Sequence, residues 1–303
     1  MPSMNELEIV EWLRAQQVSH PHVKVGIGDD MAVLQCSTDQ MLLSCDFLLD
    51  GVHFDTARHK PEEIGRKAVA CSLSDCAAMA VRPVGALMSV ALPAKFSTAS
   101  VQGLFRGALS IAAEYDVAII GGDTTRWGHP LAVDVTIAAV AYEGIAPVTR
   151  GGARPGDAFY VTGPLGGSNL AKHMTFTPRV REARDLAATL QTDLHAMMDI
   201  SDGLALDLWR MCKESNVGAI LDERQLQAVV SEEARLAGEQ DERSAVDHAL
   251  TDGEDYELLL AVGGVVAKSE VDLYAIGITT ESELLIRRLD GRLEQLEPRG
   301  FIH

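Results

Sequence analysis

The chain has few aromatic residues, 5% of its 303 positions, and no long hydrophobic run. A membrane-spanning helix needs about 20 consecutive apolar residues, so the sequence predicts no transmembrane segment. The first residues, MPSMNELEIVEWLRAQQ, predict an acidic amphipathic helix over 5–17. They lack the basic and apolar regions of a secretory signal.

Cysteine is also scarce, and its pattern excludes several kinds of site. The five cysteines are odd in number and form no CxxC pair. This pattern disfavours a zinc site and predicts reduced thiols in a cytoplasmic protein. The cysteines are Cys36, Cys45, Cys71, Cys76 and Cys212.

Basic residues are outnumbered, 26 against 44 acidic ones, which gives a formal charge of −18. Such a surface repels nucleic acid and anionic membranes, so neither is expected as a partner. It also repels free nucleotides and phosphates. An anionic substrate would therefore need cations to accompany it.

What remains is a globular chain, 47% apolar and 23% charged, of one large domain or two ordinary ones. The first half predicts mixed α/β structure without strict βαβ alternation. A loop rich in glycine, proline and arginine, 147–157, predicts a boundary between domains 1–146 and 147–303.

The stretch VAIIGGDTTR places an apolar strand, Val117–Ile120, directly before two glycines, an acid, two hydroxyls and an arginine. Glycines let a ligand approach the backbone, and such a loop can hold a metal-bound phosphate. The alternative is an ordinary surface turn over 121–126, because the same residue types are common in turns.

Other acids lie beside apolar segments. The helix predicted over 62–80 carries Asp75 on its apolar face, where a buried charge needs either a basic partner or a metal ion. The strand predicted over 41–46 ends in Asp46. The loop that follows contains His53, either a packing residue or a functional one.

In the second half, helices are predicted over 179–196 and 204–215. Ser201 or Asp202 can cap the second of these helices, and the same turn can hold an anion or, with Asp199, a cation.

If several of these acids converge, each close pair at about 4 Å costs about 4 kcal/mol at an effective dielectric constant near 20. A few such pairs would cancel the roughly 5–15 kcal/mol that stabilises a domain. Convergence therefore requires divalent cations, and oxygen ligands favour Mg²⁺. The acids are Asp30, Asp46, Asp75, Asp123, Asp199 and Asp202.

Seven motifs occur in an order that closely resembles the thiamine-monophosphate kinases, which belong to the aminoimidazole ribonucleotide synthetase superfamily. The resemblance runs over nearly the whole chain. GIGDD is shared across the superfamily, whereas the combination of DGVHF, GGDTTR and GEDYEL points to the kinases. The motifs are GIGDD (26–30), SCDFLLDGVHF (44–54), LSDCAAM (73–79), GGDTTR (121–126), TRGGARPGD (149–157), DISDGL (199–204) and GEDYEL (253–258).

The resemblance implies a mixed-sheet α/β N-terminal domain, an α+β C-terminal domain and a homodimer built through N-terminal strands. It implies direct phosphoryl transfer from ATP to thiamine monophosphate, assisted by several Mg²⁺ ions. Asp123, Arg150 and Asp75 are the residues expected to act in catalysis.

The resemblance also assigns binding roles. The implied metal ligands are Asp30, Ser44, Cys45, Asp46, Asp75, Asp123, Asp199 and Asp202. The implied ATP contacts are Phe105, Gly122, Asp123, Arg150 and Ser201, and the implied thiamine monophosphate contacts are His53, Glu254 and Phe301.

One departure is Cys45, where many members of the family have threonine. Either its backbone carbonyl serves the metal or one ion binds less firmly. The alternative functions are another ATP-dependent enzyme of the superfamily and a nucleotide-binding regulator without catalysis. No reactive cysteine precedes Cys36, which argues against a selenophosphate synthetase.

Overall fold

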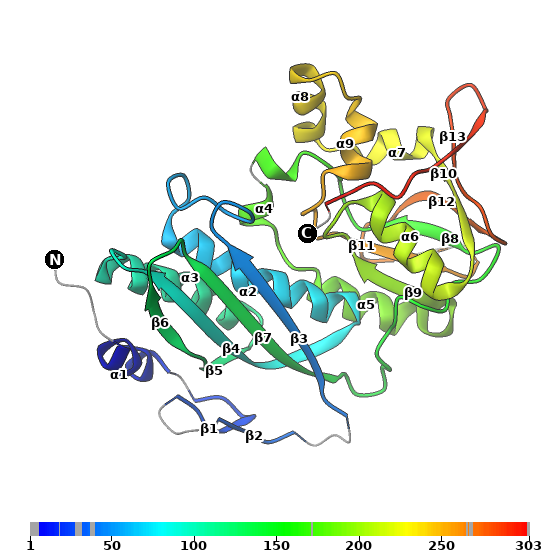
Figure 1. Ribbon diagram of the computed structural model, residues 1–303. Coiled ribbons are helices and arrows are strands. Elements are labelled where there is room, and N and C mark those ends of the chain that lie inside the picture. The colour runs from blue at the N-terminus through cyan, green and yellow to red at the C-terminus, as the bar shows by residue number, and fades with distance from the viewer. Residues whose placement is uncertain are drawn as a thin grey trace. The chain divides into compact units, whose positions relative to one another are not determined.

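The computed structural model describes residues 6–17, 19–27, 32–36, 40–170, 172–264, 266 and 269–301. The chain divides into two compact units (Figure 1). Unit 1 comprises residues 1–76 and 82–141, and unit 2 comprises 77–81 and 142–303. Asp30 lies outside the described residues, so its role stays a prediction.

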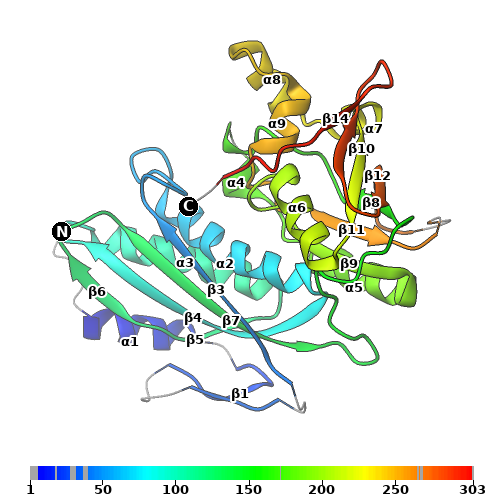
Figure 2. The same ribbon diagram turned by 45° about the vertical axis from the view of Figure 1, so that its right-hand side comes forward.

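Unit 1 is built on a mixed sheet whose described strands follow the order β3-β7-β4-β5, with β6 also paired to β4. β3 runs antiparallel to β7, whereas β5 and β6 run parallel to β4. Helices α2 and α3 lie along one face of the sheet (Figures 1 and 2). The elements are α1 Glu6–Gln16, β1 Val23–Val25, β2 Val33–Leu34, β3 Leu42–Leu49, α2 Pro61–Ala78, β4 Val81–Pro93, α3 Thr98–Glu114, β5 Ala118–Gly121, β6 Thr124–Trp127 and β7 Ala132–Ala141.

Helices α2 and α3 touch backbone to backbone, which places α2 at a set position over the sheet. A Cβ atom on Gly65 would lie 1.8 Å from the carbonyl oxygen of Leu104, and one on Gly107 would lie 1.9 Å from that of Glu62. Glycine at both crossing points therefore lets the helices approach closely. This packing determines where Asp75, near the end of α2, meets the sheet.

Unit 2 contains a described sheet in the order β14-β13-β10-β12-β8-β11-β9, with antiparallel and parallel pairs. Its apolar core joins residues of α6, α7, α8 and α9 to this sheet. The elements are β8 Ala158–Val161, α4 Lys172–Thr175, α5 Val180–Leu190, β9 Leu194–Asp199, α6 Leu204–Ser215, β10 Gly218–Asp222, α7 Glu223–Val229, α8 Glu232–Gln240, α9 Ala245–Thr251, β11 Leu258–Val262, β12 Tyr274–Thr280, β13 Leu284–Arg287 and β14 Leu293–Gln295, with 3-10 turns at Ser168–Leu170 and Gln191–Asp193.

Three predicted element boundaries were wrong. β3 continues to Leu49, so Asp46 lies inside a strand rather than at its end. Residues 124–127 form β6 instead of a turn, because they pair with β4. The helix expected over 179–196 ends at Leu190, and the apolar residues that follow form β9.

The break between β5 and β6 depends on Gly122. Its φ of +146° lies in a region that favours glycine, and a Cβ there would lie 1.9 Å from the carbonyl oxygen of Met88 on β4. The absent side chain therefore allows the turn to lie against the neighbouring strand.

We predict that Gly122→Ala lowers the free energy of unfolding by about 2–4 kcal/mol, because its backbone must move away from β4. Urea denaturation measures this loss. Gly128→Ala is the matched control: nothing lies within 4 Å of a Cβ at that position, so its change should stay within about 0.5 kcal/mol. Equal stabilities for the two variants would contradict the steric argument.

A buried carboxyl group organises the glycine-rich loop 163–168 of unit 2, which has the sequence GPLGGS. Asp255 is 1% exposed, and its Oδ1 accepts hydrogen bonds from the Gly166 backbone N–H at 2.9 Å and the Ser168 hydroxyl at 2.5 Å. Its Oδ2 has no hydrogen-bond partner within the described structure. Burial raises the pKa of Asp255 to about 7.

We predict a falling stability from pH 5 to pH 8 that depends on Asp255. The folded carboxyl binds its proton more tightly than the unfolded one, so this contribution is present at low pH and disappears as the pH rises through about 7. The expected decrease is about 2 kcal/mol. Urea denaturation across this range should show a flatter profile for Asp255→Asn, whereas Asp193→Asn, which removes an exposed carboxylate, should keep the wild-type slope.

Candidate active site

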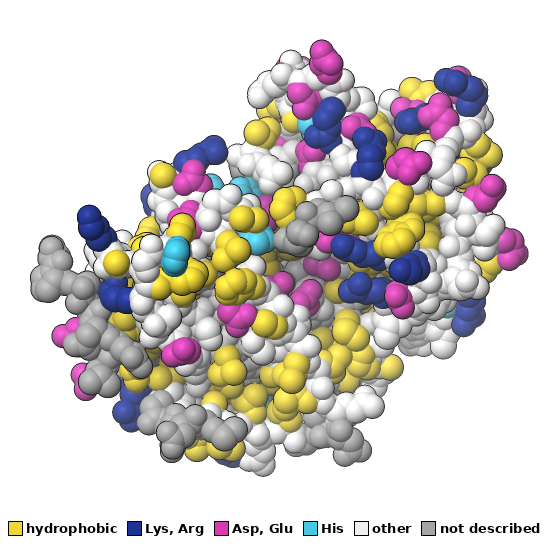
Figure 3. Space-filling view, in the orientation of Figure 1, with side chains coloured by type: hydrophobic (Ala, Val, Ile, Leu, Met, Phe, Trp, Pro, Cys, Tyr) yellow, Lys and Arg dark blue, Asp and Glu magenta, His cyan; other side chains and the backbone are white. Residues whose placement is uncertain are grey.

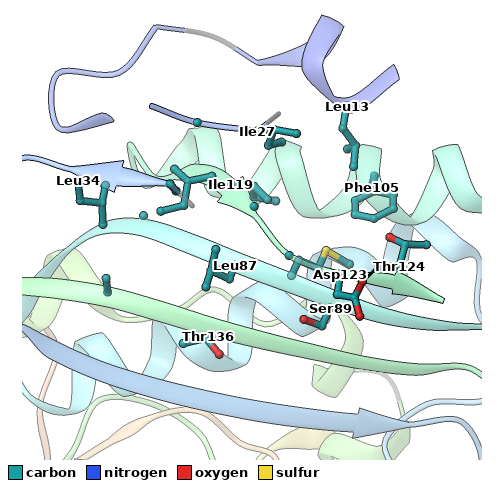
Figure 4. Close-up of a pocket in the computed structure, with 18 of the residues that line it drawn as sticks. Leu13, Ile27, Leu34, Leu87, Ser89, Phe105, Ile119, Asp123, Thr124 and Thr136 are labelled. Atoms are coloured by element: carbon teal, nitrogen blue, oxygen red, sulfur yellow. Dashed lines mark hydrogen bonds between the residues drawn. The ribbon is translucent and has the colours of Figure 1, made fainter. Parts of the chain in front are cut away.

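Unit 1 contains a pocket of about 930 Å³ on the face of its sheet that α1 and the β1–β2 segment partly cover. Leu34, Leu87 and Ile119 line its apolar part. Figure 4 shows Ser89, Asp123 and Thr124 close together near Phe105. The pocket therefore combines an apolar wall with a polar end formed where β5 gives way to β6.

The polar end is the GGDTTR segment of the sequence. Asp123 is exposed, and its Oδ1 accepts a hydrogen bond from the Thr124 backbone N–H at 2.9 Å. Arg126 donates to the carbonyl oxygens of Pro93 and Phe96, each at 3.2 Å. Phe105, Gly122 and Asp123 therefore line one pocket, whereas the other two predicted ATP contacts, Arg150 and Ser201, belong to unit 2.

Asp46 and Asp75 face each other between β3 and α2. Ser44 donates a hydrogen bond to Asp75 Oδ2, and Ser72 donates to Asp46 Oδ2 at 2.6 Å. Burial raises the pKa of Asp46 to about 7, and the negative charges of Asp75 and Asp134 contribute to the rise. A cation between these carboxylates would remove the repulsion.

The Cys45 thiol is directed to the other face of β3. It donates to Asp134 Oδ2 at 2.8 Å, whereas Ser44 and Asp46 bond to residues of α2. Alternate residues of a strand face opposite sides, so only the Cys45 backbone can share a ligand with its two neighbours. The hydrogen bond to Asp134 raises the pKa of the thiol.

Asp134 is a residue that the sequence reasoning missed. It lies on β7, where Phe47 of β3 is its register partner. Its Oδ1 also accepts a hydrogen bond from Thr136 at 3.4 Å. The sequence signal was an acid within the apolar strand LAVDVTI, but only the strand register shows that this acid lies beside Cys45.

His53, in the loop after β3, is oriented from two directions. Its Nδ1 accepts a hydrogen bond from the Leu49 N–H at 3.0 Å, so a neutral ring carries its proton on Nε2. The fully buried Lys67 of α2 donates to the His53 carbonyl oxygen at 2.5 Å. His53 can therefore present an N–H donor to a ligand.

In unit 2, the DISDGL segment joins β9 to α6. The predicted cap was wrong: the N-cap residue is Gly203, and neither Ser201 nor Asp202 caps the helix. Instead, the buried Asp207 reaches back and accepts hydrogen bonds from the Ser201 and Asp202 N–H groups at 3.0 and 2.9 Å. Burial raises the pKa of Asp207 to about 6.

The predicted metal ligands of unit 2 differ in their surroundings. Asp199 is buried at the end of β9. Asp202 is paired with Arg210 Nη1 at 2.5 Å, and Asp207 shares that guanidinium at 2.7 Å. Asp202 would have to bind a metal beside an arginine.

Glu254 and Phe301 meet the same segment of unit 2. The Glu254 N–H donates to the Ser201 carbonyl oxygen at 2.7 Å, and the Phe301 N–H donates to that of Asp202 at 2.9 Å. Glu254 has a φ of +54°, and its carboxylate pairs with His173 at 3.1 Å. Two predicted substrate contacts therefore gather around the turn between β9 and α6.

A network of ion pairs surrounds Glu257, three residues after Glu254 in the chain. Glu257 is 1% exposed and accepts hydrogen bonds from Lys172 and Arg179 at 2.8 to 2.9 Å. Burial raises the pKa of Glu257, but these two cations together hold it below its usual range. Sequence reasoning missed this network, whose only signal was the acidic run GEDYE.

Two observations concern the predicted set of metal ligands and ATP contacts. Within the part of the chain that the structure describes, no three His, Cys, Asp or Glu side chains form a group that could hold a metal ion. Asp46 and Asp75 supply one pair, and Asp30 is outside the described ranges. Arg150 is exposed in unit 2, and its carbonyl oxygen accepts a hydrogen bond from Ser215 at 3.4 Å.

Both halves of the chain match one family. The family model described as AIR synthase related protein, N-terminal domain, matches residues 28–142, and the corresponding C-terminal domain matches residues 154–287. The thiamine-monophosphate kinase of Rhodopirellula baltica is 38% identical over 313 residues, covering 98% of this chain and 97% of that protein.

Solved structures give the same result. The thiamine-monophosphate kinase from Stenotrophomonas maltophilia K279a has a TM-score of 0.79 at 30% identity, covering 97% of this chain and 99% of that one. The structure of AaThiL complexed with AMPPCP and TMP has a TM-score of 0.73 at 27% identity and covers 99% of both chains. These matches confirm the two-domain fold, and the chain belongs to the thiamine-monophosphate kinase family.

Proposed function

We propose that this protein transfers the γ-phosphoryl group of ATP to thiamine monophosphate, giving ADP and thiamine diphosphate. The observation that carries the proposal is the similarity to thiamine-monophosphate kinases over nearly the whole chain. The carboxylate pair and the pocket of unit 1 supply chemistry that suits this reaction.

The donor atoms around Asp46 and Asp75 fit Mg²⁺, because carboxylates and hydroxyls are hard oxygen ligands. In this proposal Asp46, Asp75, Asp123 and Ser44 hold Mg²⁺ in unit 1, and the further proposed ligands are Asp30, the Cys45 backbone, Asp199 and Asp202. When bound, the metal neutralises charge on the phosphate chain of ATP.

The polar end of the unit 1 pocket is the proposed nucleotide contact. Phe105, which is 1% exposed, and Gly122 line the pocket beside the exposed carboxylate of Asp123. Arg150 and Ser201 are the proposed ATP contacts in unit 2. The Arg150 guanidinium and the Ser201 hydroxyl are donors suited to phosphate oxygens.

For thiamine monophosphate, the proposed contacts are His53, Glu254 and Phe301. The His53 Nε2–H can donate to a phosphate oxygen, and the Glu254 carboxylate can accept from an amino group. The Phe301 ring is 43% exposed and can cover a heterocycle.

The acceptor oxygen belongs to a phosphate that is already anionic, so the reaction needs no strong general base. The task of the enzyme is to align two anions and to stabilise the charge of the transition state. We therefore propose direct in-line transfer, in which Arg150 or Arg126, together with backbone N–H groups, orients the phosphates and no phosphorylated protein forms.

We expect wild-type protein to form thiamine diphosphate from ATP and thiamine monophosphate, with label from [γ-³²P]ATP entering the product and not the protein. Asp75→Asn should lower turnover at least about 100-fold, because it removes a carboxylate from the phosphate-binding site. Its fold should persist, since the change relieves repulsion at Asp46.

The matched control is Asp116→Asn, which removes a carboxylate whose side chain is 88% exposed. It should keep wild-type turnover. Thermal unfolding should show both variants folded. Full activity of Asp75→Asn would remove the metal-site assignment, and an inactive wild-type protein would remove the proposed function.

The proposed partner is a second copy of the chain. The face of the unit 1 sheet opposite α2 exposes Met41, Leu43, Phe47 and Leu87, with exposed fractions from 40% to 69%. Met41, Leu43 and Leu87 also line the apolar part of the unit 1 pocket, so in this proposal the second copy covers that part and the nucleotide binds at the polar end. Figure 3 also shows hydrophobic side chains gathered over the sheet of unit 1. A patch of this kind on the N-terminal strands suits a homodimer interface, as the resemblance implies.

We expect a mass of two chains by size-exclusion chromatography with light scattering. Leu43→Glu combined with Phe47→Glu should give single chains, because two carboxylates would be buried in the interface. The control, Leu293→Glu, changes a residue of unit 2 that is 52% exposed and should leave the dimer intact. A dimeric double variant would exclude this face.

No helix in the described residues is long and apolar enough to cross a membrane. All five cysteines are free thiols. We place the enzyme in the cytoplasm on the basis of these thiols, which a reducing compartment keeps unpaired.

A further inference from the structure

An ion pair fastens the segment 297–301 to helix α9 of unit 2. Arg299 Nη2 lies 2.6 Å from Asp247 Oδ1. The other oxygen of Asp247 is held by Arg243 Nε at 3.0 Å. Burial raises the pKa of Asp247, but the hydrogen bonds from Arg243 and Arg299 together hold it below its usual value. Asp247 is therefore a charged link between two arginines from different segments.

The two residues after Arg299 are held against the turn that carries Asp202. A Cβ atom on Gly300 would lie 2.2 Å from the Asp202 carbonyl oxygen and 2.9 Å from the Leu206 Cβ. The Phe301 N–H donates to the same carbonyl oxygen at 2.9 Å. Arg299 and Phe301 thus have separate bonds to unit 2, Gly300 between them lies close against the turn, and Phe301 carries the aromatic ring.

The segment 297–301 and its bonds to Asp247 and Asp202 are called the clamp below. Arg243, which also binds Asp247, connects the clamp to the glycine-rich loop 163–168. Arg243 Nη2 lies 2.9 Å from Asp252 Oδ1, and Asp252 Oδ2 accepts a hydrogen bond from the Gly167 N–H at 2.9 Å. The neighbouring Gly166 N–H is bound by Asp255, which follows Glu254 in the chain. The network therefore connects segments that carry two of the proposed substrate contacts.

We propose that Asp247 and Arg299 are positioning residues that hold the Phe301 ring where it contacts thiamine monophosphate. This inference rests on the proposed function. Arg299 is 62% exposed, and ion pairs this open to solvent contribute little to overall stability. The effect of the pair is therefore local: it restricts the backbone that carries Phe301.

Steady-state kinetics of Arg299→Ala and Asp247→Asn test the proposal. Each variant should raise the KM for thiamine monophosphate about five- to tenfold, while the KM for ATP and kcat stay within about twofold. A change of about tenfold corresponds to 1.4 kcal/mol of binding free energy. The control is Arg292→Ala, which breaks a more exposed pair with Asp290 and should change neither KM.

A double-variant experiment separates positioning from a general structural effect. If Arg299 acts through the Phe301 ring, then adding Arg299→Ala to Phe301→Ala should raise the KM for thiamine monophosphate by less than about twofold further. An undiminished effect in that background would overturn the proposal, as would an unchanged KM in the single variants.

Trypsin cleavage after Arg299 tests the clamp without any turnover. Asp247→Asn should speed cleavage at Arg299 about fivefold, measured by mass spectrometry, relative to cleavage after Arg292 in the same sample. If wild-type protein makes no thiamine diphosphate, the proposed function fails, and this ratio still reports on the clamp. An unchanged ratio shows that Asp247 does not hold the segment.

Discussion

The main physical constraint in unit 1 is that two negatively charged carboxylates, those of Asp46 and Asp75, lie close together in a largely buried site. Asp46 and Asp75 come from a strand and a helix that pack together, so neither can move away without disturbing β3 or α2. Ser44 donates a hydrogen bond to Asp75 and Ser72 donates one to Asp46, but burial, with the charge of Asp75 contributing, still raises the pKa of Asp46 to about 7. A site that keeps this strain while folded favours a divalent cation that arrives with its substrate.

In unit 2, several acidic side chains are instead paired with lysine and arginine side chains of the same unit. Asp207 shares the Arg210 guanidinium with Asp202, Glu257 binds Lys172 and Arg179, and Asp247 lies between Arg243 and Arg299. These pairs fix the loops around the proposed substrate contacts. The acids of unit 1 suit metal binding, whereas those of unit 2 mainly hold backbone in place. Asp202 is paired with Arg210, so it resembles the acids that hold backbone in place more than the metal ligand that its motif predicts.

Much of the fold was predictable from local patterns. Helical periodicity predicted α1, α2 and α6 closely, because their apolar stripes persist over several turns. The errors arose where long-range pairing overrode local signals. Thr124–Trp127 resembles a turn, yet it becomes a strand because β4 offers it a free edge. Asp46 seemed to end a strand, yet β7 pairs with the whole of Leu42–Leu49.

For the candidate site, the sequence alone determined the family and identified the acids proposed as metal ligands, because both follow from residue types in a recognisable order. The tertiary structure decided which groups share a space. Strand register placed Asp134 beside Cys45 and turned that thiol away from Asp46. Helix packing brought Asp75 to Asp46, and the return of the chain over α6 and α9 joined Arg299 to Asp247. These contacts lie beyond sequence patterns because they join residues distant in the chain, whose approach is set by the packing of whole elements.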